Sequence, residues 1–176
     1  MKQIFSVFFA AAILMSFEAQ AEFRRIDLTI FGMDWAVCAH AVSVSIKKME
    51  GVESVQVSLN EGLAKIQLKP GNKVRLAQLR KSVADNGFTP KEASVAVLGE
   101  IISTNGRLQL KVTGADEIFD LSLAPKAPQT ENELKKQEGK TLFVEGIVVP
   151  PKEKKAFPNL EIVSFKDRKE LEGKNE

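Results

Sequence analysis

The spacing of apolar residues in the first half of the chain switches between two periods, and this switching restricts the fold. Ile26, Leu28 and Ile30 alternate with polar residues, which predicts a strand with one buried face. The spacing then changes to steps of three and four residues, which predicts a short amphipathic helix that ends at Gly51. The apolar positions of that helix are Ala39, Val42, Ile46 and Met49.

The same two periods continue through a hairpin, a second helix and a last strand. Residues 55–59 and 64–68 alternate on either side of an Asn-Glu-Gly turn, which predicts an antiparallel hairpin. Helical spacing returns over 76–83, and a strand is expected over 93–97. The order strand, helix, strand, strand, helix, strand is typical of the α+β ferredoxin-like fold, in which two helices cover one face of a four-stranded antiparallel sheet.

Short strands dominate the second half, with one short charged helix between the third and the fourth. The predicted strands cover 98–103, 106–113, 118–124, 140–149 and 160–165, and the helix covers 131–138. This order resembles a small OB-like barrel, in which Gly99, Gly114 and Gly146 would serve tightly coiled strands. The alternative is a small open β-sheet packed on the first domain.

The N-terminal 21 residues have the order of a secretory signal peptide. Lys2 precedes an apolar run of about a dozen residues, and Ala19 and Ala21 offer a cleavage site before Glu22. The alternative is a membrane anchor, but a bilayer requires roughly 20 apolar residues. We therefore expect a secreted or periplasmic protein that is not inserted in a membrane after cleavage.

The remaining length is sufficient for two small domains. We expect a ferredoxin-like domain over 22–94, an OB-like β domain over 95–166 and a charged tail over 167–176. The formal net charge is only +2, and Lys and Arg alternate with Glu and Asp, so no nucleic-acid partner is expected. The sequence has neither a Ser/His/Asp set nor a Gly-rich phosphate loop, so we do not expect an enzyme.

Two stretches of the first half carry a resemblance to a known family: GMDWAVCAHAVSVSIKKMEGVESVQVSLNEGLAKIQL and VRLAQLRKSVADNGF. They resemble the heavy-metal-associated domain, the module of copper and mercury chaperones and of metal-pumping ATPases. The resemblance covers residues 23 to about 93, with spacing that runs without a gap from Gly32 to Phe88. It implies a soft metal ion held between two loop cysteines. Cys38 matches the second of these, and Trp35 occupies the position of the first.

Three residues are candidate metal ligands. Cys38 is the sole cysteine, and the positive end of the helix dipole favours its thiolate form. His40 lies two residues further on, which turns its side chain roughly 200° away along a regular helix. It can join Cys38 if the helix begins late or if it comes from a second molecule. Met33 matches the family's loop methionine, which packs under the loop but carries a soft thioether.

These residues support two hypotheses about function. In the first, the protein binds or carries a soft metal ion through Cys38, with His40, Met33 or a second molecule completing the site. Cu(I) is the most tolerant ion, because it accepts few and soft ligands. In the second, the domain is an adaptor without metal, and Trp35 anchors a protein partner. In both, Phe88 is expected to pack beside the loop.

Overall fold

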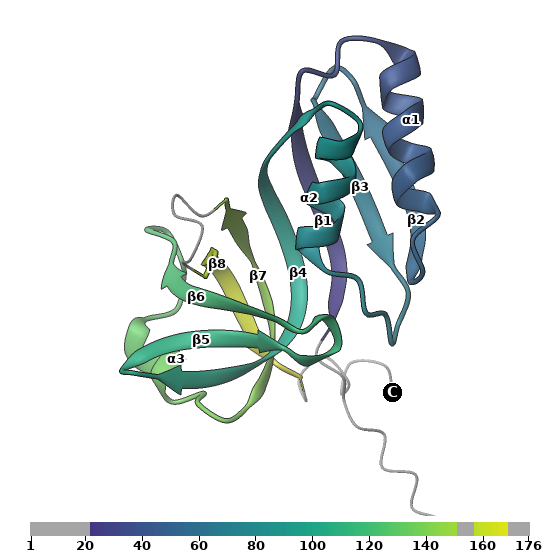
Figure 1. Ribbon diagram of the computed structural model, residues 1–176. Coiled ribbons are helices and arrows are strands. Elements are labelled where there is room, and N and C mark those ends of the chain that lie inside the picture. The colour runs from purple at the N-terminus through teal and green to yellow at the C-terminus, as the bar shows by residue number, and fades with distance from the viewer. Residues whose placement is uncertain (1–21, 151–156, 169–176) are drawn as a thin grey trace, which may run out of the picture.

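The computed structural model describes residues 22–150 and 157–168 (Figure 1). The predicted signal peptide and residues 169–176 of the predicted tail lie outside these ranges. Within the described ranges, no helix is long and apolar enough to cross a membrane. The elements are β1 Phe23–Phe31, α1 Ala36–Lys47, β2 Val52–Ser58, β3 Leu63–Leu68, α2 Leu76–Asp85, β4 Thr89–Thr104, β5 Arg107–Val112, a 3₁₀ turn Thr113–Ala115, β6 Glu117–Leu123, α3 Glu131–Lys135, β7 Thr141–Val149 and β8 Asn159–Asp167.

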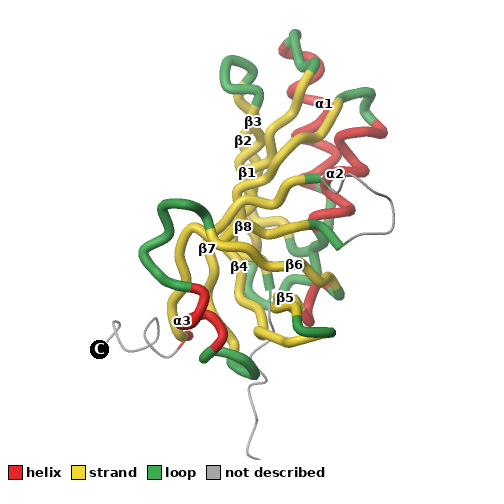
Figure 2. Tube along the Cα trace, turned by 90° about the vertical axis from the view of Figure 1, so that its left-hand side faces the viewer, coloured by secondary structure: helices red, strands yellow, loops and turns green. Residues whose placement is uncertain are grey.

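The first half forms the predicted ferredoxin-like arrangement. Its strands lie in the order β2-β3-β1-β4, and every pairing among them is antiparallel. Both helices cover the same face of this sheet (Figure 2). The alternating residues Ile26 and Leu28 of β1 are fully buried, as are Val42 of α1 and Leu79 of α2. The change between strand spacing and helix spacing of the apolar residues therefore predicted correctly which faces of the strands and helices lie in the core.

Strand β4 is one continuous element, so the predicted break between a strand over 93–97 and another over 98–103 is wrong. Its first part pairs with β1, its middle with β7 and its last part with β5. Val95, Ala96, Val97 and Leu98 are all buried, because β4 is covered on both faces here. A strand buried on both faces loses its alternation, which removes the signal that separates it from the next segment. The predicted domain boundary at residue 94 lies inside β4.

Five strands of the second half pair in a closed ring. β4 pairs with β5, β5 with β6, β6 with β8, β8 with β7, and β7 with β4 again. Only the β6–β8 pairing is parallel in this ring. The order of elements agrees with the sequence, with α3 between the third and fourth strands of the ring. The OB-like barrel geometry remains a prediction.

Helix α3 is shorter than predicted, because it ends at Lys135 and not at residue 138. Thr130 caps its start by accepting a hydrogen bond from the backbone N–H of Glu133 at 3.3 Å. Leu134 is its one buried residue, so little apolar contact supports a second turn. The chain instead closes a tighter turn, in which the backbone N–H of Gln137 donates to the carbonyl oxygen of Leu134 at 3.0 Å.

Two of the predicted ring glycines lie where a side chain has no room. A Cβ on Gly99 would lie 2.5 Å from Cγ of Leu110, and one on Gly146 would lie 2.5 Å from the carbonyl oxygen of Glu161. Neighbouring strands can therefore approach closely at both positions.

The two halves of the chain also share one hydrophobic core. In this core, the rings of Phe23 and Phe119 meet edge to face with centroids 6.1 Å apart.

Candidate metal loop

The loop between β1 and α1 holds the predicted site residues. Gly32 follows the end of β1 and has a φ of +90°, a conformation that favours glycine. Met33 then turns into the core and is only 6% exposed. Trp35 is the N-cap residue directly before α1, with an extended backbone and no capping hydrogen bond from its side chain. The loop therefore reverses the chain over four residues and leads directly into the helix that carries Cys38.

Cys38 lies in the first turn of α1, as the sequence predicted. Its backbone N–H donates to the carbonyl oxygen of Trp35 at 3.0 Å. The side chain is half-buried and packs against the hydrophobic core. No acidic residue lies in this first turn of α1. The sulfur is thus held at the edge of the core, close to the free backbone N–H groups of a helix start.

The three candidate ligands differ in burial. Met33 lies in the core cluster against which Cys38 packs, whereas His40 is exposed to solvent. Two residues along α1 turn a side chain by roughly 200°, which accounts for the separation of Cys38 from His40. In residues 22–150 and 157–168, no group of three or more His, Cys, Asp or Glu side chains is arranged to hold a metal ion.

Three large apolar side chains near the start of α1 are exposed. Phe31 is 69% exposed, Trp35 is 74% exposed and Val37 is 79% exposed, and we call these three residues the loop surface. The ammonium group of Lys91 lies 5.7 Å from the centroid of the Phe31 ring, within the range of a cation–π contact. Of these three residues, only Trp35 was predicted from the sequence to be exposed. The alternation of β1 also predicts Phe31 to point away from the buried face, since Ile30 points into it.

The C-terminal end of α2 is joined to the helix of Cys38. The side-chain amide of Asn86 donates to the hydroxyl oxygen of Ser45 on α1 at 3.1 Å and to the carbonyl oxygen of Ser82 at 2.8 Å. Phe88 follows and is half-buried against the core, consistent with the packing role expected for it. Ser45 lies seven residues after Cys38, so both occupy the same side of α1, toward α2.

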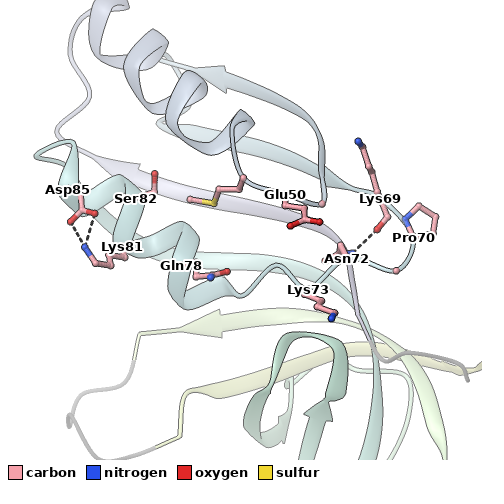
Figure 3. A pocket seen from close by; sticks show the side chains of 12 residues that line it. Glu50, Lys69, Pro70, Asn72, Lys73, Gln78, Lys81, Ser82 and Asp85 are labelled. Atoms are coloured by element: carbon pink, nitrogen blue, oxygen red, sulfur yellow. Dashed lines mark hydrogen bonds and ion pairs between the residues drawn. The ribbon is translucent and has the colours of Figure 1, made fainter.

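A groove of about 880 Å³ lies elsewhere, between the turn that follows α1, the loop from β3 to α2, and α2 itself (Figure 3). Lysine and acidic side chains line it, and Lys81 is paired there with Asp85 at 2.8 Å. None of the predicted site residues belongs to its lining. The groove is therefore separate from the metal loop and from the first turn of α1, where Cys38 lies.

Comparison with known proteins places the first half in a family. Residues 27–89 match the heavy-metal-associated domain. The human copper-transporting ATPase 2 is 38% identical over 78 residues, which are 44% of this chain and 5% of that protein. The copper chaperone CopZ of Staphylococcus saprophyticus is 30% identical over 64 residues, which are 36% of this chain and 93% of that protein.

Solved structures are similar to about the same part of the chain. A CopZ metallochaperone is 27% identical with a TM-score of 0.36, and the match covers 38% of this chain and 97% of that one. Oxidized MerP from Ralstonia metallidurans CH34 is 29% identical with a TM-score of 0.36, covering 42% and 96% respectively. The chain spans only a small part of the ATPase but nearly all of the chaperone CopZ. Through residues 27–89, the chain belongs to the heavy-metal-associated domain family.

Proposed function

We propose that the protein binds or carries a soft metal ion of the Cu(I) type, with Cys38 as the indispensable ligand. The observation that carries this proposal is the place of Cys38 in the first turn of α1, half-buried at the edge of the core. The printed names of two relatives, a copper chaperone and a copper-transporting ATPase, support the choice of metal. The role is binding and transfer, without catalysis.

The site is completed from outside the monomer. Met33 is buried and His40 is exposed, and a step of two residues along a helix turns His40 roughly 200° from Cys38, so we expect a further ligand from a second molecule. Cu(I) tolerates two or three soft ligands, and a thiolate of a second molecule supplies the missing one. Such a site holds its ion weakly in the monomer, which suits a protein that receives a metal and passes it on.

Export and the form of the second half belong to the same proposal. The order of Lys2, an apolar run and the Ala19-Gln20-Ala21 site supports cleavage before Glu22 and a secreted or periplasmic location. For residues 95–166 we propose an OB-like barrel, and the closed ring of five paired strands supports it.

A second candidate function is a metal-free adaptor, and the loop surface specifically favours it. Phe31, Trp35 and Val37 are each more than two thirds exposed. Aromatic side chains are enriched among the residues that dominate binding energy in protein interfaces. If the protein is an adaptor, the loop contacts a protein partner, and Trp35 serves that contact in the position where the family has a metal ligand.

Native mass spectrometry after loading with Cu(I) distinguishes the two functions. We expect one copper ion per monomer or per dimer in the wild type, and none in Cys38→Ser. Ser43→Ala is the matched control, because it changes a hydroxyl on the same helix and keeps the thiol. If Cys38→Ser retains copper as well as the wild type, Cys38 is not the ligand. If the wild type binds none, the adaptor function is the better one.

A further inference from the structure

An acidic residue of the ring caps a helix of the heavy-metal-associated domain. Glu117, the first residue of β6, accepts hydrogen bonds from the backbone N–H groups of Leu76 at 2.9 Å and of Ala77 at 3.0 Å. These are the first two residues of α2, and they precede Glu117 by about 40 positions in the sequence. The free N–H groups at the start of α2 are therefore satisfied by the other half of the molecule.

A second tie lies one turn further along α2. The guanidinium group of Arg80 donates to the carbonyl oxygen of Val148 on β7 at 2.9 Å and to that of Lys91 on β4 at 3.3 Å. Burial lowers the pKa of Arg80, and the nearby carboxylate of Glu117 acts in the opposite direction. Glu117 and Arg80 thus hold the same stretch of α2 against the ring from two directions.

The other end of α2 reaches the helix of the candidate ligand. Asn86, the residue after α2, contacts Ser45 of α1 through its side-chain amide. Ser45 shares the α2-facing side of α1 with Cys38. One helix therefore connects the ring, at its start, with the side of α1 that carries Ser45 and Cys38, at its end. The family match ends at residue 89, so Glu117 lies outside the family's own domain.

We propose that the ring acts as a clamp on α2, and that Glu117 and Arg80 are positioning residues that limit the accessibility of the Cys38 thiol. When the clamp is closed, α2 is fixed along the flank of α1 and the thiol stays at the edge of the core. When the clamp is released, α2 moves away from α1 and the thiol becomes more exposed. A partner that contacts the ring can in this way regulate the metal loop without touching it.

Two measurements on the full chain test the clamp, and neither requires metal. Hydrogen exchange reports the protection of the Leu76 and Ala77 amides, and the rate of alkylation by iodoacetamide reports the access to Cys38. Glu117→Ala should speed amide exchange at both positions roughly tenfold, since each lost bond involves a charged acceptor. It should also raise the alkylation rate of Cys38 severalfold.

Glu133→Ala is the matched control. Glu133 also accepts a hydrogen bond at a helix start, from the backbone N–H of Thr130 at 2.7 Å, but donor and acceptor both lie within the second half. Its removal should change exchange only around α3 and leave the alkylation of Cys38 unchanged. Glu117→Gln provides a milder variant that keeps one side-chain acceptor, and its effects should lie between those of the wild type and Glu117→Ala.

Two results would overturn the proposal. If Glu117→Ala loosens the start of α2 while Cys38 is alkylated at the wild-type rate, the cap is a local feature that does not reach the loop. If amide exchange at Leu76 and Ala77 does not change in either Glu117 variant, Glu117 does not hold α2. Both results are independent of copper binding, so they are distinguishable from a failure of the proposed metal-binding function.

Discussion

Trp35 and Cys38 are joined by a backbone hydrogen bond of 3.0 Å, in which the N–H of Cys38 donates to the carbonyl oxygen of Trp35. The bond fixes the start of α1 without using either side chain. The Trp35 side chain points into solvent, whereas the Cys38 side chain packs against the core. The residue at position 35 can therefore be replaced while the position of Cys38 is retained.

Replacement of Trp35 by alanine should leave the free energy of unfolding within about 0.5 kcal/mol of the wild type, because the side chain is largely exposed. Urea denaturation measures this. Trp35 is also the sole tryptophan in the chain, so intrinsic fluorescence reports this loop alone. We expect the emission of a solvated indole. A loss of stability of several kcal/mol on this replacement would mean that Trp35 is part of the core.

The pH dependence of stability should reveal the buried position of Glu117. Burial is the largest effect and raises the pKa of Glu117. The hydrogen bonds from the two backbone N–H groups and the charges of Arg75 and Arg80 lower the pKa, but by less. The folded state then binds this proton more tightly than the unfolded chain does. The stabilisation is complete below the unfolded pKa, which is about 4.3, and is lost as the pH rises through the folded pKa.

Glu117→Gln does not titrate, so the stability of the wild type relative to this variant should fall as the pH is raised from about 4 to about 7. Glu133→Gln should show the opposite trend. Hydrogen bonds from the backbone N–H and the hydroxyl of Thr130 lower the pKa of Glu133, so its contribution is lost as the pH falls. Urea denaturation from about pH 3 to about pH 7 checks both signs, because the Glu133 contribution is lost only below its unfolded pKa of about 4.3. Trends of the same sign would contradict the two environments.

The close contact between Gly99 and Leu110 predicts coupled effects on stability. Gly99→Ala should cost about 1–3 kcal/mol, because the new Cβ would overlap the Leu110 side chain. Leu110→Ala should cost about 2–5 kcal/mol, since Leu110 is fully buried. The double variant should be more stable than the sum of the two costs predicts, by about 1 kcal/mol. Strict additivity in denaturant unfolding would show that the two residues do not touch.

The sequence predicted the elements whose burial differs between two faces. Ile26, Leu28 and Ile30 identify β1 because their neighbours are polar, and helical spacing identifies α1 in the same way. The continuation of β4 past Val97 could not be predicted, because burial on both faces removes the alternation. The ring closes through pairings between strands that are distant in the sequence, and the spacing of neighbouring residues does not predict such pairings.

The candidate site was predicted in part. The place of Cys38 in the first turn of α1 follows from the local spacing of the helix. The cap that Glu117 provides does not, since Asp116 and Glu117 fit a turn between strands locally, and the N–H groups that Glu117 meets are about 40 residues away. The exposure of Val37 also depends on which side of α1 faces the sheet, which tertiary packing decides.

The most direct test of a metal loop that lacks one ligand is the affinity of Trp35→Cys for Cu(I), measured by competition with a chelator at several protein concentrations. The residue that precedes a helix and the third residue within it can meet side by side, as capping pairs do, so two thiols there can chelate one ion. We predict binding roughly 100-fold tighter than in the wild type. Its affinity should also be independent of protein concentration, whereas the wild type should bind more tightly as dimers become populated. Binding of one ion per wild-type monomer as tightly as in Trp35→Cys would contradict the account, because His40 or Met33 would then already complete the site.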